Sequence, residues 1–334
     1  MATVVFGHPW RVASEACRSR TMCSAQVLAA PGLWGGARTA LTEYLASWNS
    51  GATKQAILGL VEALTTPGPG SVEPADRIAT FDNDGTLWVE KPAPPQADFL
   101  IRVWTQAARN DPSLRSRQPY QAIIEQDMDY FQGLVTQDPD VVASLEGAVA
   151  ETWAGTSPEV FDAQVRHWVE TVTQPRFQVG YTRLVYKPML ELFDLLKAHE
   201  FRVFVCSGGG RDFMRVFAEQ TWGILKENVI GSAPAYEYKD GKITRTDQLL
   251  GGLSLGPGKP EHIFAQTGRM PLFAGGNADV DIEMLTAASF ALLVKHDDGD
   301  REYAYTEAAE NALAKAGELG WTVVSMKDDW ATIF

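Results

Sequence analysis

The stretch IATFDNDGTLW, residues 78–88, begins as a short strand-like segment and changes abruptly into two acids, an asparagine, a glycine and a threonine. A short apolar segment of this kind is typical of a strand buried inside a sheet. Asp82 and Asp84 follow it directly. Because ligands of open α/β sheets bind beyond the carboxyl ends of the strands, we expect a reactive site to begin at Asp82.

Helices and strands alternate along the rest of the chain. The apolar spacing predicts a helix from about Leu41 to Leu64, mostly helical structure from about Ala97 to Val172, and a hairpin within residues 228–246 around the turn Lys-Asp-Gly. Short apolar runs predict further strands at 201–206, near 271–276, at 290–295 and at 321–325. Strands that alternate with helices predict an α/β fold with a mostly parallel sheet, covered on both faces.

Composition limits the classes of partner. The 334 residues carry 29 basic and 42 acidic side chains, which gives a formal net charge of −13 and argues against nucleic acid as a partner. No run approaches the roughly 18 consecutive apolar residues of a membrane span, so we expect no membrane partner. Three cysteines, an odd number, favour a cytoplasmic location over a disulfide framework, with export as the alternative suggested by the arginines and short apolar run of the first 40 residues.

Polar clusters follow three of the predicted strands. Asp82 and Asp84 come after the first, Ser207 with the glycines Gly208 to Gly210 after the second, and the segment Asn277 to Asp281 after a later one. Lys259 begins a predicted helix just before the third cluster. Because parallel strands end at one edge of a sheet, these groups are expected to meet there.

This set of side chains suits a phosphate ester with a divalent metal ion. Asp82 could attack phosphorus, and Asp84 could protonate the leaving oxygen and later deprotonate water. Two acids this close repel each other unless a cation such as magnesium lies between them. The hydroxyl of Ser207, the amides of the glycines and the ammonium of Lys259 could hold the phosphate oxygens.

Each cluster alone has a simpler interpretation. Asp-x-Asp-Gly is usually a solvated turn, a glycine run is usually flexible, and Asn277, Asp279 and Asp281 could merely cap a helix. An EF-hand is excluded, because Leu87 and Ala93 stand where that calcium loop needs glycine and glutamate. The order of the clusters, each after an apolar strand, favours the functional interpretation.

Four segments together resemble the motifs of the haloacid dehalogenase-like (HAD) hydrolase superfamily, in its phosphoserine-phosphatase-like branch. They are, in order, FDNDGTLW (81–88), VFVCSGGG (203–210), Lys259 in GPGKPEH (256–262), and FAGGNADVDIEML (273–285). The resemblance implies a magnesium-dependent phosphatase that hydrolyses a small phosphorylated metabolite through an aspartyl-phosphate. It also implies a Rossmann-like core with a mostly parallel sheet (41–89 and 187–334), an inserted helical cap domain (90–186) and an N-terminal extension (1–40).

The resemblance also assigns roles to the residues. Asp82 is the expected nucleophile and Asp84 the acid/base. From their chemistry, Ser207 and Lys259 are expected to take part in catalysis and, with Gly208 and Gly209, to bind the substrate. Magnesium is expected on the Asp82 carboxylate, on the backbone carbonyl of Asp84 and on the fourth motif.

The fourth motif departs from the family pattern, because Asn277 stands where an aspartate is usual. An amide oxygen can bind magnesium but brings no charge, so Asn277, Asp279 and Asp281 all stay candidates for the remaining ligand. Asn277 also motivates a competing hypothesis, a binding or regulatory protein with weak catalysis. A phosphotransferase or a phosphonate-cleaving member is a third, and the sequence gives neither the substrate nor the oligomeric state.

Overall fold

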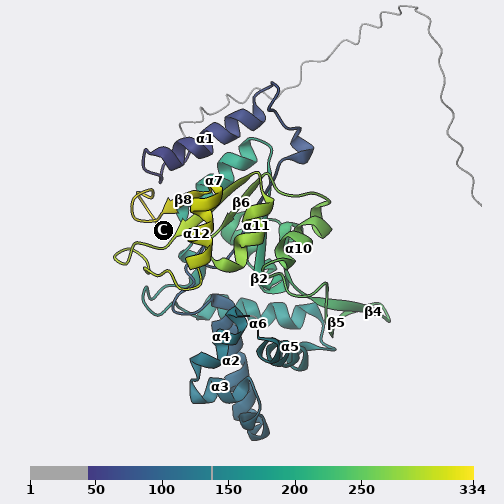
Figure 1. Cartoon of the computed structure of the whole chain (residues 1–334). Helices are drawn as coiled ribbons and strands as arrows, with labels where there is room; N and C mark the ends of the chain where they lie inside the picture. Colours follow the sequence, from purple (N-terminus) through teal and green to yellow (C-terminus); the bar gives the residue numbers. More distant parts are fainter. Residues whose placement is uncertain (1–43, 137) are drawn as a thin grey trace, which may run out of the picture. The chain divides into compact units, whose positions relative to one another are not determined.

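The computed structural model describes residues 44–136 and 138–334, which all belong to one compact unit, Thr39–Phe334. The expectation of an N-terminal extension over residues 1–40 lies outside these described residues. Figure 1 shows a central sheet with helices on both sides and a separate group of helices at one end of the strands.

Six parallel strands form the main sheet in the order β3-β2-β1-β6-β7-β8, and a separate hairpin contains β4 and β5. The strands are β1 (Ile78–Phe81), β2 (Arg202–Gly210), β3 (Val229–Ser232), β4 (Pro234–Lys239), β5 (Lys242–Leu249), β6 (Phe273–Gly276), β7 (Phe290–Lys295) and β8 (Thr322–Ser325). The expectation of an α/β, Rossmann-like fold is confirmed.

The helices surround this sheet or fall between its strands. The α-helices are α1 (Ala52–Thr65), α2 (Pro95–Asn110), α3 (Tyr120–Glu125), α4 (Met128–Val135), α5 (Pro139–Trp153), α6 (Pro158–Thr171), α7 (Lys187–Ala198), α8 (Arg211–Arg215), α9 (Ala218–Trp222), α10 (Gly258–Thr267), α11 (Ile282–Ala287) and α12 (Glu310–Leu319). Short 3₁₀ helices are η2 (Pro74–Asp76), η3 (Pro112–Ser116), η4 (Tyr181–Arg183), η5 (Lys226–Asn228) and η6 (Asp279–Asp281).

Alternate residues along the strands of the main sheet belong to two different hydrophobic clusters. Ala79 and Phe81 pack into the cluster that includes residues of α1 and α7, whereas Ile78 packs into the cluster with residues of α10, α11 and α12. Both faces of the sheet are therefore covered. This explains why the strands are continuously apolar instead of alternating between apolar and polar residues.

The register of the central strand places the polar clusters side by side. Phe81, the last residue of β1, lies opposite Val205 of β2 and Gly275 of β6. One residue further along the chain, Asp82 therefore lies between the ends of β2 and β6. The sheet itself brings together groups that are more than a hundred residues apart in the sequence.

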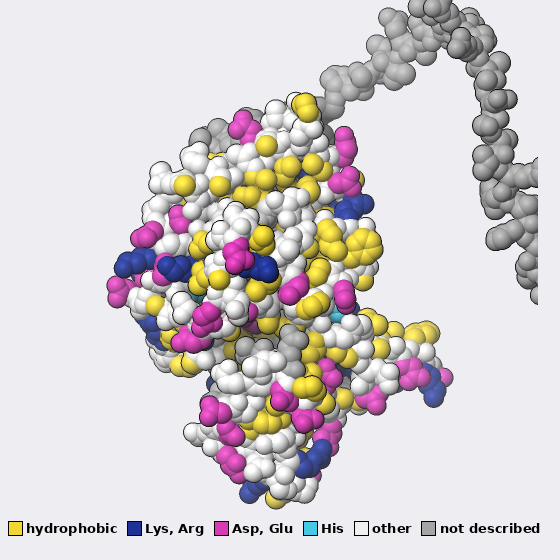
Figure 2. Space-filling view, in the orientation of Figure 1, with side chains coloured by type: hydrophobic (Ala, Val, Ile, Leu, Met, Phe, Trp, Pro, Cys, Tyr) yellow, Lys and Arg dark blue, Asp and Glu magenta, His cyan; other side chains and the backbone are white. Residues whose placement is uncertain are grey.

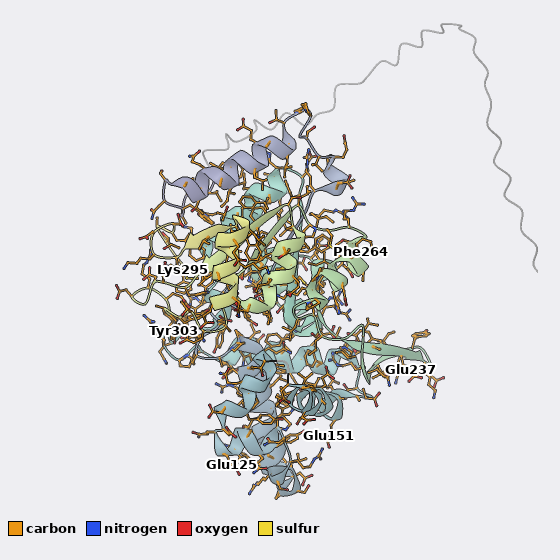
Figure 3. All side chains as sticks on the ribbon, viewed as in Figure 1. Glu125, Glu151, Glu237, Phe264, Lys295 and Tyr303 are labelled. Carbon is orange, nitrogen blue, oxygen red and sulfur yellow. The ribbon has the colours of Figure 1, made fainter. Side chains whose placement is uncertain are left out.

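The helices α2 to α6 are inserted between β1 and β2, and we call them the helical insertion. The connectors that enter and leave it pair with each other: Tyr186 donates its N–H to the Leu87 carbonyl at 2.8 Å, and Val89 donates to Leu184 at 3.2 Å. Figure 3 labels Glu125 and Glu151 in the insertion, Lys295 at the end of β7 and Phe264 on α10.

A cluster of buried aromatic rings fastens the insertion to the rest of the unit. Phe213 of α8 lies 5.5 Å, between ring centroids, from both Phe99 of α2 and Trp168 of α6. Trp168 also stacks on Tyr181 at 5.2 Å. Burying rings of this size stabilises the junction by about 1.5–3 kcal/mol per ring.

Two boundaries differ from those expected. The helix predicted from Leu41 begins at Ala52, because Trp48 pairs instead with Trp330 of the C-terminal segment and donates its indole N–H to the Pro188 carbonyl at 2.9 Å. The predicted hairpin begins only at Pro234, since residues 229–232 form β3 of the main sheet. Tertiary contacts decide both positions.

The hairpin projects from the unit, and hydrophobic side chains lie along it in Figure 2. Tyr238 and Ile243 lie opposite each other and are 72% and 43% exposed. Asp240 and Gly241, with φ of 51° and 77°, make the predicted turn. Over residues 44–136 and 138–334, no helix is both long and apolar enough to cross a membrane.

Candidate active site

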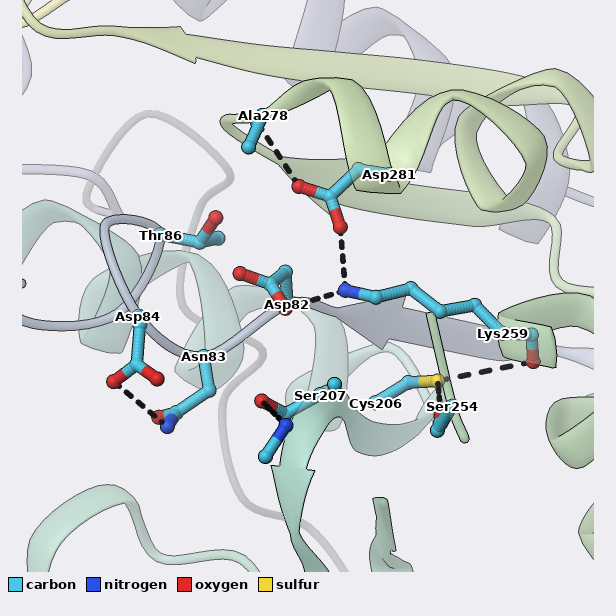
Figure 4. Close-up of polar contacts among 12 residues, drawn as sticks. Asp82, Asn83, Asp84, Thr86, Cys206, Ser207, Ser254, Lys259, Ala278 and Asp281 are labelled. Carbon is cyan, nitrogen blue, oxygen red and sulfur yellow. Dashed lines mark hydrogen bonds and ion pairs between the residues drawn. The ribbon is translucent and has the colours of Figure 1, made fainter. Parts of the chain in front are cut away.

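Lys259 lies at the centre of a buried cluster of charges. Its ammonium contacts Asp82 Oδ1 and Asp281 Oδ1, each at 2.5 Å (Figure 4). Lys259 and Asp281 have no exposed surface, and Asp82 is 7% exposed. Three segments meet here as predicted, the end of β1, the start of α10 and the loop after β6.

The charges in this cluster shift one another's pKa values. Burial raises the pKa of Asp82 well above its usual value, and the neighbouring charge of Asp281 raises it further. Burial alone would lower the pKa of Lys259, but the two carboxylates outweigh that effect and raise it. Burial and the second carboxylate therefore disfavour the ionised form of Asp82, and the Lys259 ammonium favours it.

Asp84 lies beside this cluster in different surroundings. Its Oδ1 accepts hydrogen bonds from the Trp88 indole at 2.7 Å and from the Asn83 amide at 3.1 Å. Burial raises the pKa of Asp84 to about 7, although the Trp88 hydrogen bond lowers it. A carboxyl group with this pKa can both donate and accept a proton near neutrality.

Gly85 makes the turn that separates Asp84 from the rest of the loop. Its φ is +73°, and a Cβ on this residue would run into the Asn277 amide and lie 2.7 Å from Glu90 Oε1. His296 also holds this residue, because its Nε2 lies 2.8 Å from the Gly85 carbonyl oxygen. The predicted turn therefore has a steric reason as well as a conformational one.

Ser207 and the glycines after it form the end of β2, not the flexible turn that a glycine run usually indicates. Ser207 is buried, and its Oγ accepts the N–H of Gly209 at 3.0 Å. The Gly210 N–H donates to Oε1 of Gln96, on the insertion, at 2.6 Å. Gly208 to Gly210 are half-buried.

The three candidates of the fourth motif have different surroundings. Asn277 Oδ1 accepts the Thr86 hydroxyl at 2.9 Å and faces the first motif. Asp281 uses both oxygens within the protein, Oδ1 for Lys259 and Oδ2 for the N–H groups of Asn277 and Ala278. Asp279 caps α12 through the Ala312 N–H at 2.8 Å, away from Asp82.

The types of oxygen atom at this site suit a magnesium ion bound by one carboxylate and by neutral oxygen atoms. Asp82 Oδ2 has no hydrogen-bond partner among the described residues, and Asn277 Oδ1 keeps a second lone pair. In the described part of the chain, no group of three or more His, Cys, Asp and Glu side chains could hold a metal ion. One carboxylate, one amide oxygen and the Asp84 carbonyl are compatible with magnesium, which usually keeps several waters and binds substrate phosphate.

Several residues around the site gave no signal in the sequence. His296 lies between the Gly85 carbonyl and Glu302, whose Oε2 is 3.1 Å from His296 Nδ1, and both side chains are buried. Tyr305 donates its hydroxyl proton to Glu90 Oε1, which also accepts the Asn277 amide at 3.1 Å. His296, Glu302 and Tyr305 follow β7 in irregular segments, so neither periodicity nor a motif marks them.

Comparisons with known proteins agree with the sequence resemblance. Residues 79–286, well over half of the chain, match the sequence model of the family described as haloacid dehalogenase-like hydrolase. No curated protein matches the chain.

Solved structures are similar to the chain in fold. A conserved, functionally unknown protein from Anaerococcus prevotii is 14% identical with a TM-score of 0.55, and the match covers 85% of this chain and 96% of that one. A phosphoserine phosphohydrolase-like protein from Francisella tularensis is 15% identical with a TM-score of 0.43, over 73% and 99% of the two chains. A substrate-bound phosphoserine phosphatase is 17% identical with a TM-score of 0.41, over 73% and 98%.

Gly85→Ala should destabilise the protein. A left-handed φ costs an L-residue on the order of 1–2 kcal/mol, and the new methyl group would also displace the Asn277 amide. Gly147→Ala is the control, because it lies within α5 with open space around it and should gain about 0.5–1 kcal/mol. Urea unfolding measures both changes. Equal stability of Gly85→Ala and wild type would contradict the described geometry.

Proposed function

The chain belongs to the haloacid dehalogenase-like hydrolase family, and we propose that it is a phosphatase that hydrolyses a small phosphate monoester through an aspartyl-phosphate on Asp82. The observation that carries this proposal is the pair of acids with unlike surroundings. Burial raises the pKa of both carboxyl groups, that of Asp84 to about 7, but Asp82 is paired with Lys259 at 2.5 Å, whereas Asp84 accepts hydrogen bonds from Trp88 and Asn83. Such a pair suits a nucleophile and a proton donor.

In the first half of the proposed reaction, a carboxylate oxygen of Asp82 attacks phosphorus. The bond between phosphorus and the ester oxygen breaks, and Asp84 gives its proton to the leaving alkoxide. Lys259 holds the carboxylate of Asp82 in place. Its positive charge stabilises the negative charge of the phosphoryl oxygens. The Ser207 hydroxyl and the amide of Gly208 are proposed to bind those oxygens, and the Gly209 N–H, which donates to Ser207 Oγ at 3.0 Å, would have to exchange that partner to join them.

In the second half, Asp84 takes a proton from water. The oxygen of that water attacks phosphorus, the bond to Asp82 breaks, and inorganic phosphate leaves. Asp82 is then a carboxylate again and Asp84 is protonated, so the site returns to its starting state. A displacement at carbon, as in dehalogenation, would have no use for a proton donor in the position of Asp84.

Magnesium is the proposed cofactor. Bound there, it would neutralise charge on the phosphoryl oxygens. Asp82, the Asp84 carbonyl and Asn277 are its proposed ligands. Asp281 is proposed to orient Lys259 instead, because both of its oxygens already accept hydrogen bonds within the protein.

The substrate is proposed to be a small phosphorylated metabolite. The net charge of −13 disfavours nucleic acid as a substrate. The helical insertion is proposed to act as a cap over the site.

The odd number of cysteines leads us to propose a cytoplasmic location. A family member with weak catalysis that mainly binds ligand is the competing proposal, because Asn277 brings no charge to the metal.

Asp82→Asn should abolish turnover, because an amide is a far weaker nucleophile than a carboxylate. With magnesium and an aryl phosphate as substrate, we expect a loss of at least about a thousandfold. Beryllofluoride, an analogue of the phosphorylated aspartate, should raise the thermal unfolding temperature of wild type and not that of the variant. Asp247→Asn, an exposed change of the same kind on β5, is the control. Equal activity of wild type and Asp82→Asn would contradict the proposed mechanism.

Asn277→Asp should tighten magnesium binding, since affinity of such sites rises with the number of charged ligands. We expect the magnesium concentration for half-maximal activity to fall roughly tenfold. Without magnesium, the new carboxylate would face Glu90, which now accepts the Asn277 amide at 3.1 Å. The unfolding temperature of the variant should therefore rise more steeply with magnesium than that of wild type.

The control for this prediction is Asn110→Asp, the same chemical change at an exposed position at the end of α2. Its response to magnesium should equal that of wild type. If Asn277→Asp also responds to magnesium as wild type does, Asn277 is not a ligand and the proposed donor set is wrong.

A further inference from the structure

His296 and Glu302 form a buried polar pair that the proposed reaction does not use. Both lie in the segment between β7 and α12, and they are 4% and 0% exposed. His296 Nδ1 lies 3.1 Å from Glu302 Oε2, and His296 Nε2 lies 2.8 Å from the carbonyl oxygen of Gly85. The pair thus reaches out of its own segment to the residue that directly follows Asp84.

The contacts of the imidazole fix the direction of its Nε2–H group. A carbonyl oxygen can only accept a hydrogen bond, so Nε2 is the donor to Gly85. On the other side of the ring, Glu302 holds Nδ1, and it does so whether the shared proton lies on the nitrogen or on the carboxyl group. Tyr305 stacks on the imidazole at 4.2 Å between ring centroids and limits its rotation.

Gly85 is the residue through which His296 acts on the loop after β1. Its N–H donates to the Trp88 carbonyl at 3.0 Å, and the Trp88 indole donates to Asp84 Oδ1 at 2.7 Å. The Gly85 carbonyl is bound from outside the loop, by His296. Glycine adopts many backbone angles at low cost, so a fixed partner for this carbonyl limits the angles of the chain next to Asp84.

We propose that His296, oriented by Glu302, is a positioning residue for the proposed reaction. By holding the Gly85 carbonyl, it keeps the Asp84 carboxyl group where it can protonate the leaving oxygen and then deprotonate water. The inference rests on the proposed phosphatase function and adds to it two residues that do not touch the substrate. A misplacement of a reacting group by about 1 Å can cost on the order of a hundredfold in rate, so the position of Asp84 has a direct effect on kcat.

Stability alone explains this pair poorly. Removing an acid and an imidazole from water costs free energy, and apolar side chains of similar volume in place of a buried ion pair often leave stability unchanged or raise it. The hydrogen bond to the Gly85 carbonyl is the contact that an apolar side chain could not supply. The pair is therefore better explained by the position that it imposes on the loop.

His296→Gln and His296→Asn separate the two contacts of the ring. The amide nitrogen of glutamine reaches about as far from the backbone as Nε2 and can still donate to the Gly85 carbonyl. The amide of asparagine reaches about as far as Nδ1, so it contacts Glu302 and leaves the carbonyl without its donor. With an aryl phosphate, we expect His296→Asn to lower kcat about ten- to hundredfold, and His296→Gln to keep kcat within about threefold of wild type.

The dissociation constant of inorganic phosphate, measured by calorimetry, should stay at its wild-type value in both variants, because Ser207 and Lys259 are unchanged. A general loss of structure would instead weaken phosphate binding as well. Asn228→Ala is the control for stability, because it removes another hydrogen bond from a side chain to a backbone carbonyl, that of Val203 near the start of β2. It should lower the unfolding temperature and leave kcat unchanged.

Glu302→Leu tests the same inference without changing the donor. It removes the partner of Nδ1 at similar volume, so the imidazole loses its orientation, and we expect kcat to fall about two- to tenfold with phosphate binding unchanged. If His296→Asn does not fold, Glu302→Leu decides the question by the same two measurements.

Wild-type kcat in both His296→Asn and Glu302→Leu, or equal losses of kcat in His296→Asn and His296→Gln, would overturn the inference alone, as long as wild type turns over and Asp82→Asn does not. Absence of both turnover and phosphate binding in wild type would overturn the proposed function, and the inference with it.

Discussion

The ammonium of Lys259, buried without any exposed surface between Asp82 and Asp281, is the interaction on which the rest of the site depends. Moving such ions out of water costs several kcal/mol each, so the three charges are stable only together. Both oxygens of Asp281 accept hydrogen bonds within the protein, and these bonds hold its carboxylate in place. Asp281 in turn holds Lys259 against Asp82.

The parallel sheet is what allows three distant segments to meet this requirement. Phe81 lies between Val205 and Gly275 in register, so the residues after β1, β2 and β6 emerge at one edge. The loop after β1 is held from outside the sheet as well. His296 contacts the Gly85 carbonyl, and Asn277 accepts the Thr86 hydroxyl, so the positions of Asp82 and Asp84 depend on residues about two hundred positions further along the chain.

The sequence predicted the parts of this arrangement that have local signals. The apolar runs mark the strands of the main sheet except β3, which was predicted as part of the hairpin, and the polar residues after them mark Asp82, Ser207 and Asn277. The surroundings of Asp281 had no local signal, since its oxygens bond to backbone groups and to Lys259 only in the folded chain. The same holds for Gln96, whose partner Gly210 lies more than a hundred residues away. The predicted start of the first helix at Leu41 was wrong for a similar reason. Trp48 is held by Trp330 and Pro188, and α1 begins only at Ala52.

The central claim is that Asp82 becomes phosphorylated during turnover, and chemical trapping tests it most directly. Borohydride reduces an acyl phosphate to an alcohol and leaves free carboxylates unchanged. Wild type that is turning over an aryl phosphate should therefore acquire homoserine at position 82, detectable by mass spectrometry of the peptide that contains residues 78–88. The same peptide with Asp82 unchanged, under conditions in which phosphate is being released, would contradict the account.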